Sequence, residues 1–232
     1  MLFFQQIYKY KKAFTLAEVL ITLLMIGIVA SLVIPALIND TQNQEFAVLL
    51  KKDVATLSSA AKMMIIDNAG TLAGVFSSGN DMVNKFGNYV IFTKKCSAGE
   101  QGCFYAGTNT WKTLYGDYGW FDHVSYGGTH ISTAILSNGE SIRFSFEDTN
   151  CEKSYGTEPS PTKHTCGWIH IDVNGFKGPN VLGRDLFALW ITKTGIYPFG
   201  IQNDTYRCNK NDSSIDSGRG CAAVVLAGKT VE

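Results

Sequence analysis

The strongest constraint on this chain is a 25-residue apolar segment close to its amino terminus. From Phe14 to Ile38, Glu18 is the single ionisable side chain. As a helix rising about 1.5 Å per residue, the segment spans roughly 37 Å, enough to cross a hydrocarbon core about 30 Å thick. An ordinary cleaved signal peptide has a shorter apolar region that ends in a small-residue cleavage site. The segment therefore predicts a membrane-spanning helix.

The charge distribution predicts the orientation of this helix. Lys9, Lys11 and Lys12 precede it, and the first seventeen residues contain no acid. Basic residues favour the cytoplasmic side, so the bulk of the chain is expected outside. Over the whole sequence, 20 basic residues balance 20 acidic ones, and Lys94-Lys95 is only a dipeptide. No nucleic acid partner is therefore expected.

A helical pattern continues beyond the apolar segment. Apolar residues recur every three or four positions, while polar residues such as Lys51 and Asp53 are assigned to the other faces. Asn68-Ala-Gly70 supplies a stop signal. One long helix from about Phe14 to Asp67 is therefore expected, with one buried stripe in its second half. The stripe consists of Phe46, Leu50, Val54, Leu57, Ala61 and Met64.

Three residues of the apolar half have properties that a simple anchor does not need. Glu18 places a carboxylate inside the membrane, which is costly unless the charge is paired or neutralised. Gly27 lets another helix approach closely. Pro35 removes a backbone hydrogen bond and favours a kink or local melting of the helix.

The segment from Lys11 to Ile21 resembles the signal of type IV prepilins and type II secretion pseudopilins. This resemblance implies that prepilin peptidase cuts between Ala13 and Phe14 and that the new amino terminus is methylated. Glu18 then lies four residues beyond that terminus, as in the family. Gly27 and Pro35 also fall where many members have a glycine and a proline. The chain departs from the family in having Ala13 where glycine is usual.

The resemblance implies a filament subunit built from four parts. These are a leader (1–13), a transmembrane and filament-stem helix (14–38), its amphipathic continuation (39–67) and an extracytoplasmic domain (68–232). In the filament, the Phe14 ammonium of one subunit would pair with Glu18 of its neighbour. The implied partners are homologous subunits, prepilin peptidase, membrane lipid and an assembly platform in the bacterial inner membrane.

Beyond the helix, the sequence predicts a disulfide-containing α+β domain. Six cysteines occur as three close pairs without a CxxC motif, which favours disulfides in an oxidising compartment over a zinc site. Local pairing is the simplest of fifteen possibilities, and reduced buried thiols are the alternative. The pairs are Cys96–Cys103, Cys151–Cys166 and Cys208–Cys221.

Strand patterns predict an antiparallel sheet of about four strands packed on the long helix, a pilin-like arrangement. The strongest signal is Asn138-Gly139 between the alternating runs 132–136 and 141–146. Further candidates are 88–93, 167–173, 185–192 and 196–199. The aromatic residues between the first candidate and the hairpin are expected to pack as core under a long connection, with a binding patch as the alternative. They are Trp111, Tyr115, Tyr118, Trp120 and Phe121.

A glycine-rich segment between two strand candidates leaves two interpretations open. Asp172 and Asn174 stand two residues apart before Gly175, and Asp185 follows after the loop. Their oxygens could bind calcium, as a late loop does in some pseudopilins. Asx and glycine residues also build turns without any metal, and the spacing departs from the EF-hand pattern.

The sequence contains no convincing active site. The histidines at 123, 130, 164 and 170 form no HExxH motif, and no GxSxG, Walker A or GxGxxG motif follows a strand candidate. A structural subunit, either a pseudopilin or a minor pilin, is the leading interpretation. The alternatives are a major or adhesive pilin serving attachment, motility or DNA uptake, and an anchored binding domain that does not polymerise.

Overall fold

The computed structural model describes residues 14–105, 107, 110–118, 129–229 and 231. Its first element is helix α1 (Leu16–Asp67), which continues through Pro35. The chain divides into two compact units, one up to Gln42 and one from Asn43 onwards. The predictions for the leader, Ala13, Trp120, Phe121 and His123 concern residues outside those described.

The first unit consists of the apolar part of α1. Its large apolar side chains are exposed, as for Leu24 and Leu32. Within the part of the chain that the structure describes, α1 is the one helix long and apolar enough to cross a membrane. An apolar surface of this kind is stable in lipid or against other helices, because in water its exposure is unfavourable.

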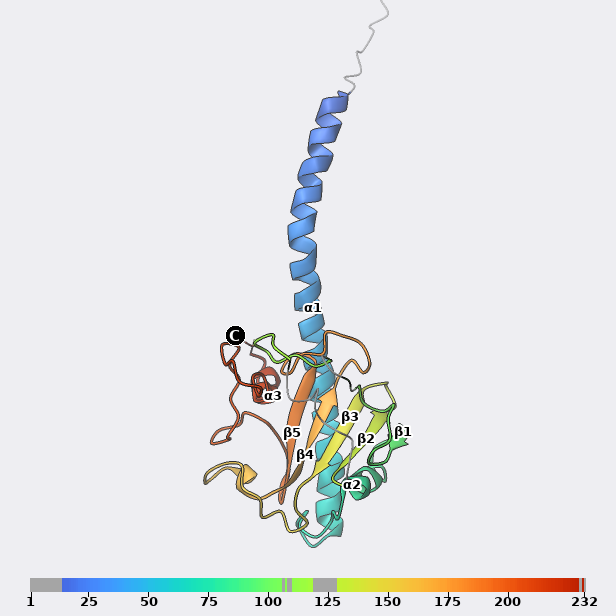
Figure 1. Cartoon of the computed structure of the whole chain (residues 1–232), viewed down its shortest axis with the longest axis vertical. Helices are drawn as coiled ribbons and strands as arrows, with labels where there is room; N and C mark the ends of the chain where they lie inside the picture. The colour runs from blue at the N-terminus through green and yellow to red at the C-terminus, as the bar shows by residue number, and fades with distance from the viewer. Residues whose placement is uncertain (1–13, 106, 108–109, 119–128, 230, 232) are drawn as a thin grey trace, which may run out of the picture. The chain divides into compact units, whose positions relative to one another are not determined.

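In the second unit, the second half of α1 and two short helices pack against a six-stranded antiparallel sheet (Figure 1). The strands follow one another in chain order, each paired with the next, which is the simplest meander. The elements after α1 are α2 (Gly79–Phe86), β1 (Phe92–Cys96), β2 (Ile131–Leu136), β3 (Ser141–Phe146), the 3₁₀ helix η2 (Pro161–Lys163), β4 (Thr165–Asp172), β5 (Leu186–Thr192), β6 (Gly195–Pro198) and α3 (Cys221–Leu226).

The expected number of about four strands is corrected to six. The edge strands β1 and β6 correspond to the candidates at 88–93 and 196–199, with β1 shifted to Phe92–Cys96. β1 exposes Lys94 and Lys95, and β6 ends at Pro198. Lysine and proline are common on edge strands because such strands pair on one side only.

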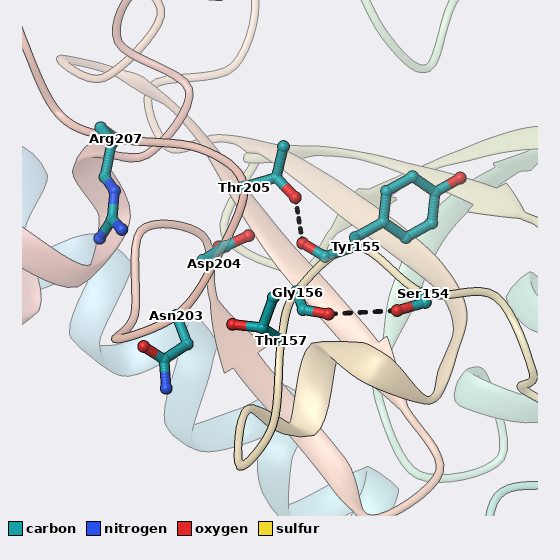
Figure 2. A pocket seen from close by; sticks show the side chains of 8 residues that line it. All are labelled: Ser154, Tyr155, Gly156, Thr157, Asn203, Asp204, Thr205 and Arg207. Atoms are coloured by element: carbon teal, nitrogen blue, oxygen red, sulfur yellow. Dashed lines mark hydrogen bonds between the residues drawn. The ribbon is translucent and has the colours of Figure 1, made fainter.

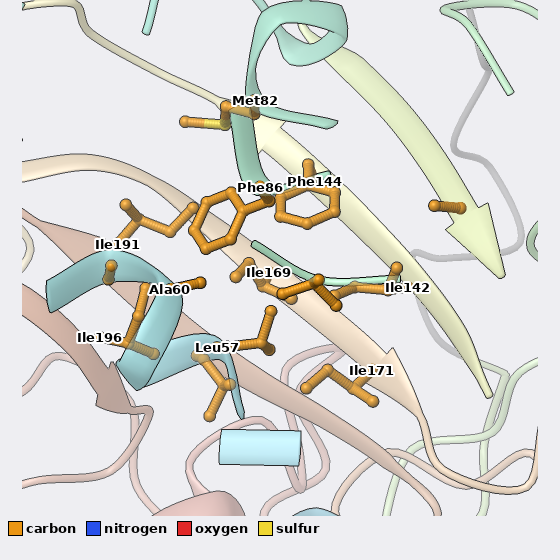
Figure 3. Close-up of a cluster of buried hydrophobic side chains, with 14 of the residues drawn as sticks. Leu57, Ala60, Met82, Phe86, Ile142, Phe144, Ile169, Ile171, Ile191 and Ile196 are labelled. Atoms are coloured by element: carbon orange, nitrogen blue, oxygen red, sulfur yellow. The ribbon is translucent and has the colours of Figure 1, made fainter. Parts of the chain in front are cut away.

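The main core lies between one face of the sheet and the second half of α1 (Figure 3). The α1 residues Phe46, Leu50, Leu57, Ala61 and Met64 are buried, and Val54 is partly buried, so the expected stripe is observed. The sheet side of this core comes from alternate positions of β3, β4 and β5, which all point to the same face. They include Ile142, Phe144, Ile169, Ile171, Phe187, Leu189 and Ile191.

One polar assignment on α1 was wrong. Asp53 was placed on a solvent face, but its side chain is only 3% exposed. Position 53 lies three residues after Leu50 and four before Leu57, so helical geometry puts it on the same stripe. Its burial depends on a polar partner supplied by the sheet, which periodicity alone does not reveal.

The opposite face of the sheet is covered by connecting segments rather than by a long helix. Trp168 and Trp190 are cross-strand neighbours on this face. Phe199 stacks on Trp190 with ring centroids 3.7 Å apart, and Tyr206 stacks on Phe199 at 5.2 Å. The guanidinium of Arg219 lies over Tyr206, 4.3 Å from the ring centroid. This aromatic cluster fixes the carboxy-terminal segment against the sheet.

Three disulfides close the connecting segments. They join Cys96 to Cys103, Cys151 to Cys166 and Cys208 to Cys221, the local pairing that the spacing favours. The first closes the loop after β1, the second ties the loop after β3 to β4, and the third ties the segment after β6 to α3. Each closes a short loop, so each removes conformational freedom mainly from the unfolded chain.

Candidate functional site

The start of α1 is a reciprocal capping arrangement between Thr15 and Glu18. The Glu18 carboxylate accepts hydrogen bonds from the Thr15 backbone N–H at 2.8 Å and from the Thr15 hydroxyl at 2.9 Å. The Thr15 hydroxyl in turn accepts from the Glu18 backbone N–H at 3.2 Å. This is the Thr-x-x-Glu capping box, in which the first turn satisfies its own free donors. The sequence signal was present at 15 and 18 and was not used in the prediction.

The capping box holds the Glu18 carboxylate against Thr15, the residue that follows Phe14. Phe14 lies immediately before the cap residue and is 84% exposed. An ammonium group at this position would stand next to a carboxylate whose hydrogen bonds come from Thr15. The arrangement can therefore present one negative charge and one positive charge at the same exposed helix end.

Gly27 and Pro35 lie farther along the same exposed part of α1. A Cβ atom built at Gly27 would meet nothing within 4 Å, so its surface is open to another helix. Pro35 lies inside the helix. Neither residue contacts Glu18, and the three share only their location on the apolar half of α1.

The structure brings Asp172, Asn174 and Asp185 together at the junction of β4 and β5. Asp185 accepts from the backbone N–H groups of Asn180 at 2.7 Å and Val181 at 2.6 Å. The Asn174 amide donates to Asp185 at 3.2 Å and to the Gly178 carbonyl at 2.9 Å. The loop between β4 and β5 thus forms several hydrogen bonds with the Asp185 side chain.

These contacts are those of a hydrogen-bonded turn, the second of the two interpretations. Both carboxylate oxygens of Asp185 already accept hydrogen bonds from the chain, and the Asn174 amide points its donor at Asp185. Without a bound ion, burial, followed by the neighbouring Asp185, raises the pKa of Asp172 to about 9. Within the described residues, no group of three or more His, Cys, Asp or Glu side chains is placed to hold a metal ion.

A second buried acidic arrangement, absent from the sequence prediction, connects α1 to the β2–β3 turn. Asp53 and Glu140 are each 3% exposed, and Lys52 lies 3.8 Å from a Glu140 carboxylate oxygen. Burial, followed by the adjacent Glu140, raises the pKa of Asp53 to about 9. Burial of the two adjacent carboxyls therefore favours a proton on the Asp53–Glu140 pair at neutral pH.

A shallow polar pocket of about 390 Å³ lies between the loop after β3 and the loop after β6 (Figure 2). Asp204 is one of the lining residues. Its carboxylate accepts hydrogen bonds from Trp190 Nε1 at 2.8 Å and from the Gly200 N–H at 2.7 Å. The lining offers hydroxyl, amide and guanidinium groups but no histidine, cysteine or lysine. It consists of Ser154, Tyr155, Gly156, Thr157, Asn203, Asp204, Thr205 and Arg207.

Among the described residues, neither the pocket lining nor the histidines form a pair of a nucleophile and a general base. The Ser154 hydroxyl donates to the Gly156 carbonyl at 3.1 Å rather than to a base. Cys166 is held in a disulfide, so it does not pair with His164 as a nucleophile. His170 is fully buried, and burial lowers its pKa well below the usual value.

Comparison with known proteins identifies one matching family model. Residues 8–34 match the prokaryotic N-terminal methylation motif. No curated protein and no solved structure matches the chain significantly. The matched region contains Phe14, the Thr15–Glu18 capping box and Gly27 and ends one residue before Pro35. The chain therefore carries the N-terminal methylation signature of type IV pilins and pseudopilins.

Proposed function

We propose that this protein is a structural subunit of a pilus-like filament, either a pseudopilin of a type II secretion-like system or a minor type IV pilin. The observation that carries the proposal is the position of Glu18. It lies inside the matched methylation motif, in the first turn of an exposed apolar helix. A lone carboxylate at the start of such a helix is expensive in lipid and requires a partner.

Processing would precede assembly. Prepilin peptidase would remove residues 1–13 by cutting between Ala13 and Phe14, and Phe14 would then be N-methylated. The described start of α1 supports this order, because the helix begins after Thr15 and its cap uses only Thr15 and Glu18. Cleavage before Phe14 would leave the helix and its cap complete.

Assembly would use the charge that processing creates. The new ammonium on Phe14 of an incoming subunit would pair with Glu18 of a neighbour, and each charge would lower the cost of placing the other in the membrane. Gly27, with open space around it, would permit close helix packing. Pro35 would provide a weak point at which packed helices bend or melt locally as the subunit leaves the bilayer.

Before assembly, the protein would be a single-pass protein of the bacterial inner membrane. Its amino terminus would be cytoplasmic, in accordance with Lys9, Lys11 and Lys12, and residues 68–232 would be extracytoplasmic. The three disulfides support an oxidising location for that domain. Its partners would be homologous subunits, the peptidase, membrane lipid and an inner-membrane assembly platform.

The first experiment measures the intact mass and amino-terminal sequence of the full chain. The protein is taken from membranes of a host with prepilin peptidase and of a matched host without it. We expect loss of residues 1–13 and a methylated Phe14 only where the enzyme is present. An uncut chain in both hosts, or a cut after Ala30 by ordinary signal peptidase, would contradict the proposal.

A further inference from the structure

Four aromatic side chains of the second unit are exposed although they belong to well-packed loops. Tyr105, Tyr115, Tyr118 and Phe176 have between 42% and 52% of their surface exposed. Tyr105 and Phe176 contact each other edge-to-face with centroids 6.1 Å apart. The Lys112 ammonium lies 5.8 Å from the Tyr118 ring centroid. We refer to these four aromatic residues as the aromatic end patch.

The aromatic end patch stands on a small hydrophobic base of its own. Phe104 stacks on the buried Trp111 at 5.5 Å, and Leu182 and Leu186 complete this base. Trp111 donates through Nε1 to the Tyr105 carbonyl at 2.9 Å. The loops are therefore held by packing, and the four rings stay outside the core because the base is already filled.

Backbone contacts tie the aromatic end patch to the end of this unit that carries Asn43. The Lys112 N–H donates to the Asn180 carbonyl at 2.9 Å, and the Lys112 carbonyl accepts from Leu182 at 2.8 Å. Two residues farther on, Arg184 Nε donates to the Asn43 side chain at 2.9 Å. The loops containing 103–105, 110–118 and 173–185 thus lie at the end of the sheet nearest Asn43.

The chain length fixes how far this end can move from a membrane. The apolar segment ends at Ile38, and Asn43 follows five residues later. Five residues span at most about 18 Å even when fully extended. While the apolar segment is inserted, Asn43 and the loops bonded to it must therefore stay close to the headgroup layer.

We propose that the aromatic end patch rests on lipid headgroups when the subunit is anchored and not yet assembled. Tyrosine and phenylalanine suit this layer because each ring enters the apolar boundary, and the tyrosine hydroxyl remains hydrated. Lys112 and Lys177 are exposed beside the patch and can meet lipid phosphates, and Asp117 is an exposed acid in the same loop as Lys112. The inference rests on the membrane anchoring of the proposed function, but not on filament entry.

A matched control is available at the other end of the unit. Ile66 is 72% exposed, more than any member of the patch. It is the penultimate residue of α1 and lies 23 residues after Asn43 along one helix, which corresponds to roughly 35 Å. Exposure alone would favour Ile66, whereas the proposal favours the patch.

The experiment places the photo-crosslinking amino acid p-benzoylphenylalanine at Tyr118, Phe176, Ile66 or Leu24 of the full chain. Each variant is reconstituted at low density in vesicles of phosphatidylethanolamine and phosphatidylglycerol, irradiated and analysed by mass spectrometry. We expect lipid adducts at Leu24, and adducts at Tyr118 and Phe176 several times more abundant than at Ile66.

Each of the remaining outcomes contradicts the proposal, but they differ in whether they also contradict membrane anchoring. Adducts at Leu24 but none above the Ile66 level at Tyr118 and Phe176 would overturn the patch and leave the anchor intact. Crosslinks of doubled protein mass at Tyr118 and Phe176 would show that a second copy covers the patch instead of lipid. If Leu24 gives no lipid adduct, the anchoring itself is wrong and the inference is wrong with it.

Discussion

The Glu18 carboxylate accepts hydrogen bonds from the N–H and the hydroxyl of Thr15, while the Thr15 hydroxyl accepts from the Glu18 N–H. The proposed assembly role of Glu18 would therefore share one side chain with this capping role. As a cap, Glu18 needs only hydrogen-bond acceptors, which glutamine also provides. As the partner of a neighbouring ammonium, it needs its negative charge. Substitutions at Thr15 and Glu18 can separate these roles.

Glu18→Gln should abolish filament entry without loosening the start of α1. The amide oxygen can still accept from Thr15, but the charge that would attract the Phe14 ammonium is removed. We expect the variant to insert into the membrane and to be cut and methylated. Its amount in sheared or purified filaments, measured by immunoblot against total membrane protein, should fall below a tenth of the wild-type amount, roughly the effect of losing a paired charge in a desolvated site.

Thr15→Val is the matched control for the cap. It removes the hydroxyl that accepts from Glu18 and keeps the carboxylate, so filament entry should persist. Normal incorporation of Glu18→Gln, or equal loss in both variants, would show that Glu18 acts only through the cap.

Asp53→Asn should reduce the loss of stability as the pH rises. The folded-state pKa of Asp53 is raised to about 9 from 3.8, so the folded state binds the extra proton between these values. The stabilisation is complete below pH 3.8 and is lost as the pH rises through about 9. One such proton changes the free energy of unfolding by up to about 1.4 kcal/mol per pH unit. Asparagine stays neutral and removes this dependence.

The measurement is thermal unfolding of the full chain in detergent, followed by near-ultraviolet circular dichroism from pH 5 to pH 9. Wild-type Tm should fall with rising pH more steeply than that of Asp53→Asn. Asp172, whose pKa is also raised to about 9, adds a similar slope to both proteins. Equal slopes for wild type and Asp53→Asn would mean that Asp53 is ionised in the folded protein.

Sequence patterns predicted the local features of the fold and missed those set by distant contacts. The β2–β3 hairpin follows from Asn138-Gly139, because a two-residue turn is determined by its own residues. The disulfide pairs follow from short spacings. By contrast, the burial of Asp53 depends on Glu140, which is far away in sequence and reaches it only once the sheet has formed.

The aromatic segment after β1 illustrates the same limit. Trp111 is buried, as expected for core packing, but Tyr115 and Tyr118 are about half exposed, which corrects the prediction for them. Composition could not distinguish these residues, because their burial depends on Leu182 and Leu186 filling the base under the loop. The six-residue helix α3 and the eight-residue α2 were likewise missed, since short helices carry few periodic positions.

Arg219→Lys should loosen the carboxy-terminal segment. Lysine keeps the charge opposite Asp216, which lies 2.9 Å away, but loses the planar stacking on Tyr206 and the hydrogen bond to its hydroxyl. A destabilisation of about 1 kcal/mol is expected from this loss. Limited trypsin digestion followed by reduction should show faster cleavage at Arg207 or Lys210. Unchanged cleavage rates would mean that the Cys208–Cys221 disulfide, rather than Arg219, stabilises this segment.

Asp185→Ala should be the most destabilising of these substitutions, and calcium should not influence the result. Removing the carboxylate leaves the N–H groups of Asn180 and Val181 and the Asn174 amide without their acceptor. Buried donors of this kind cost about 1–3 kcal/mol each before relaxation, so a net loss of roughly 2–4 kcal/mol is expected. Thermal unfolding of the full chain in detergent should show a Tm lowered by roughly 5–15 °C.

The same thermal unfolding measurements decide between the turn and the calcium interpretations of the loop between β4 and β5. With Asp185 saturated by hydrogen bonds, EGTA or millimolar calcium should leave the wild-type Tm unchanged. Asp172→Asn should also change it little, because the Asp172 carboxyl is already neutral when its pKa is about 9. If calcium instead raises the wild-type Tm by several degrees, and both Asp172→Asn and Asp185→Ala abolish the increase, then the loop binds the ion. The hydrogen bonds around Asp185 would in that case belong to the metal-free form alone.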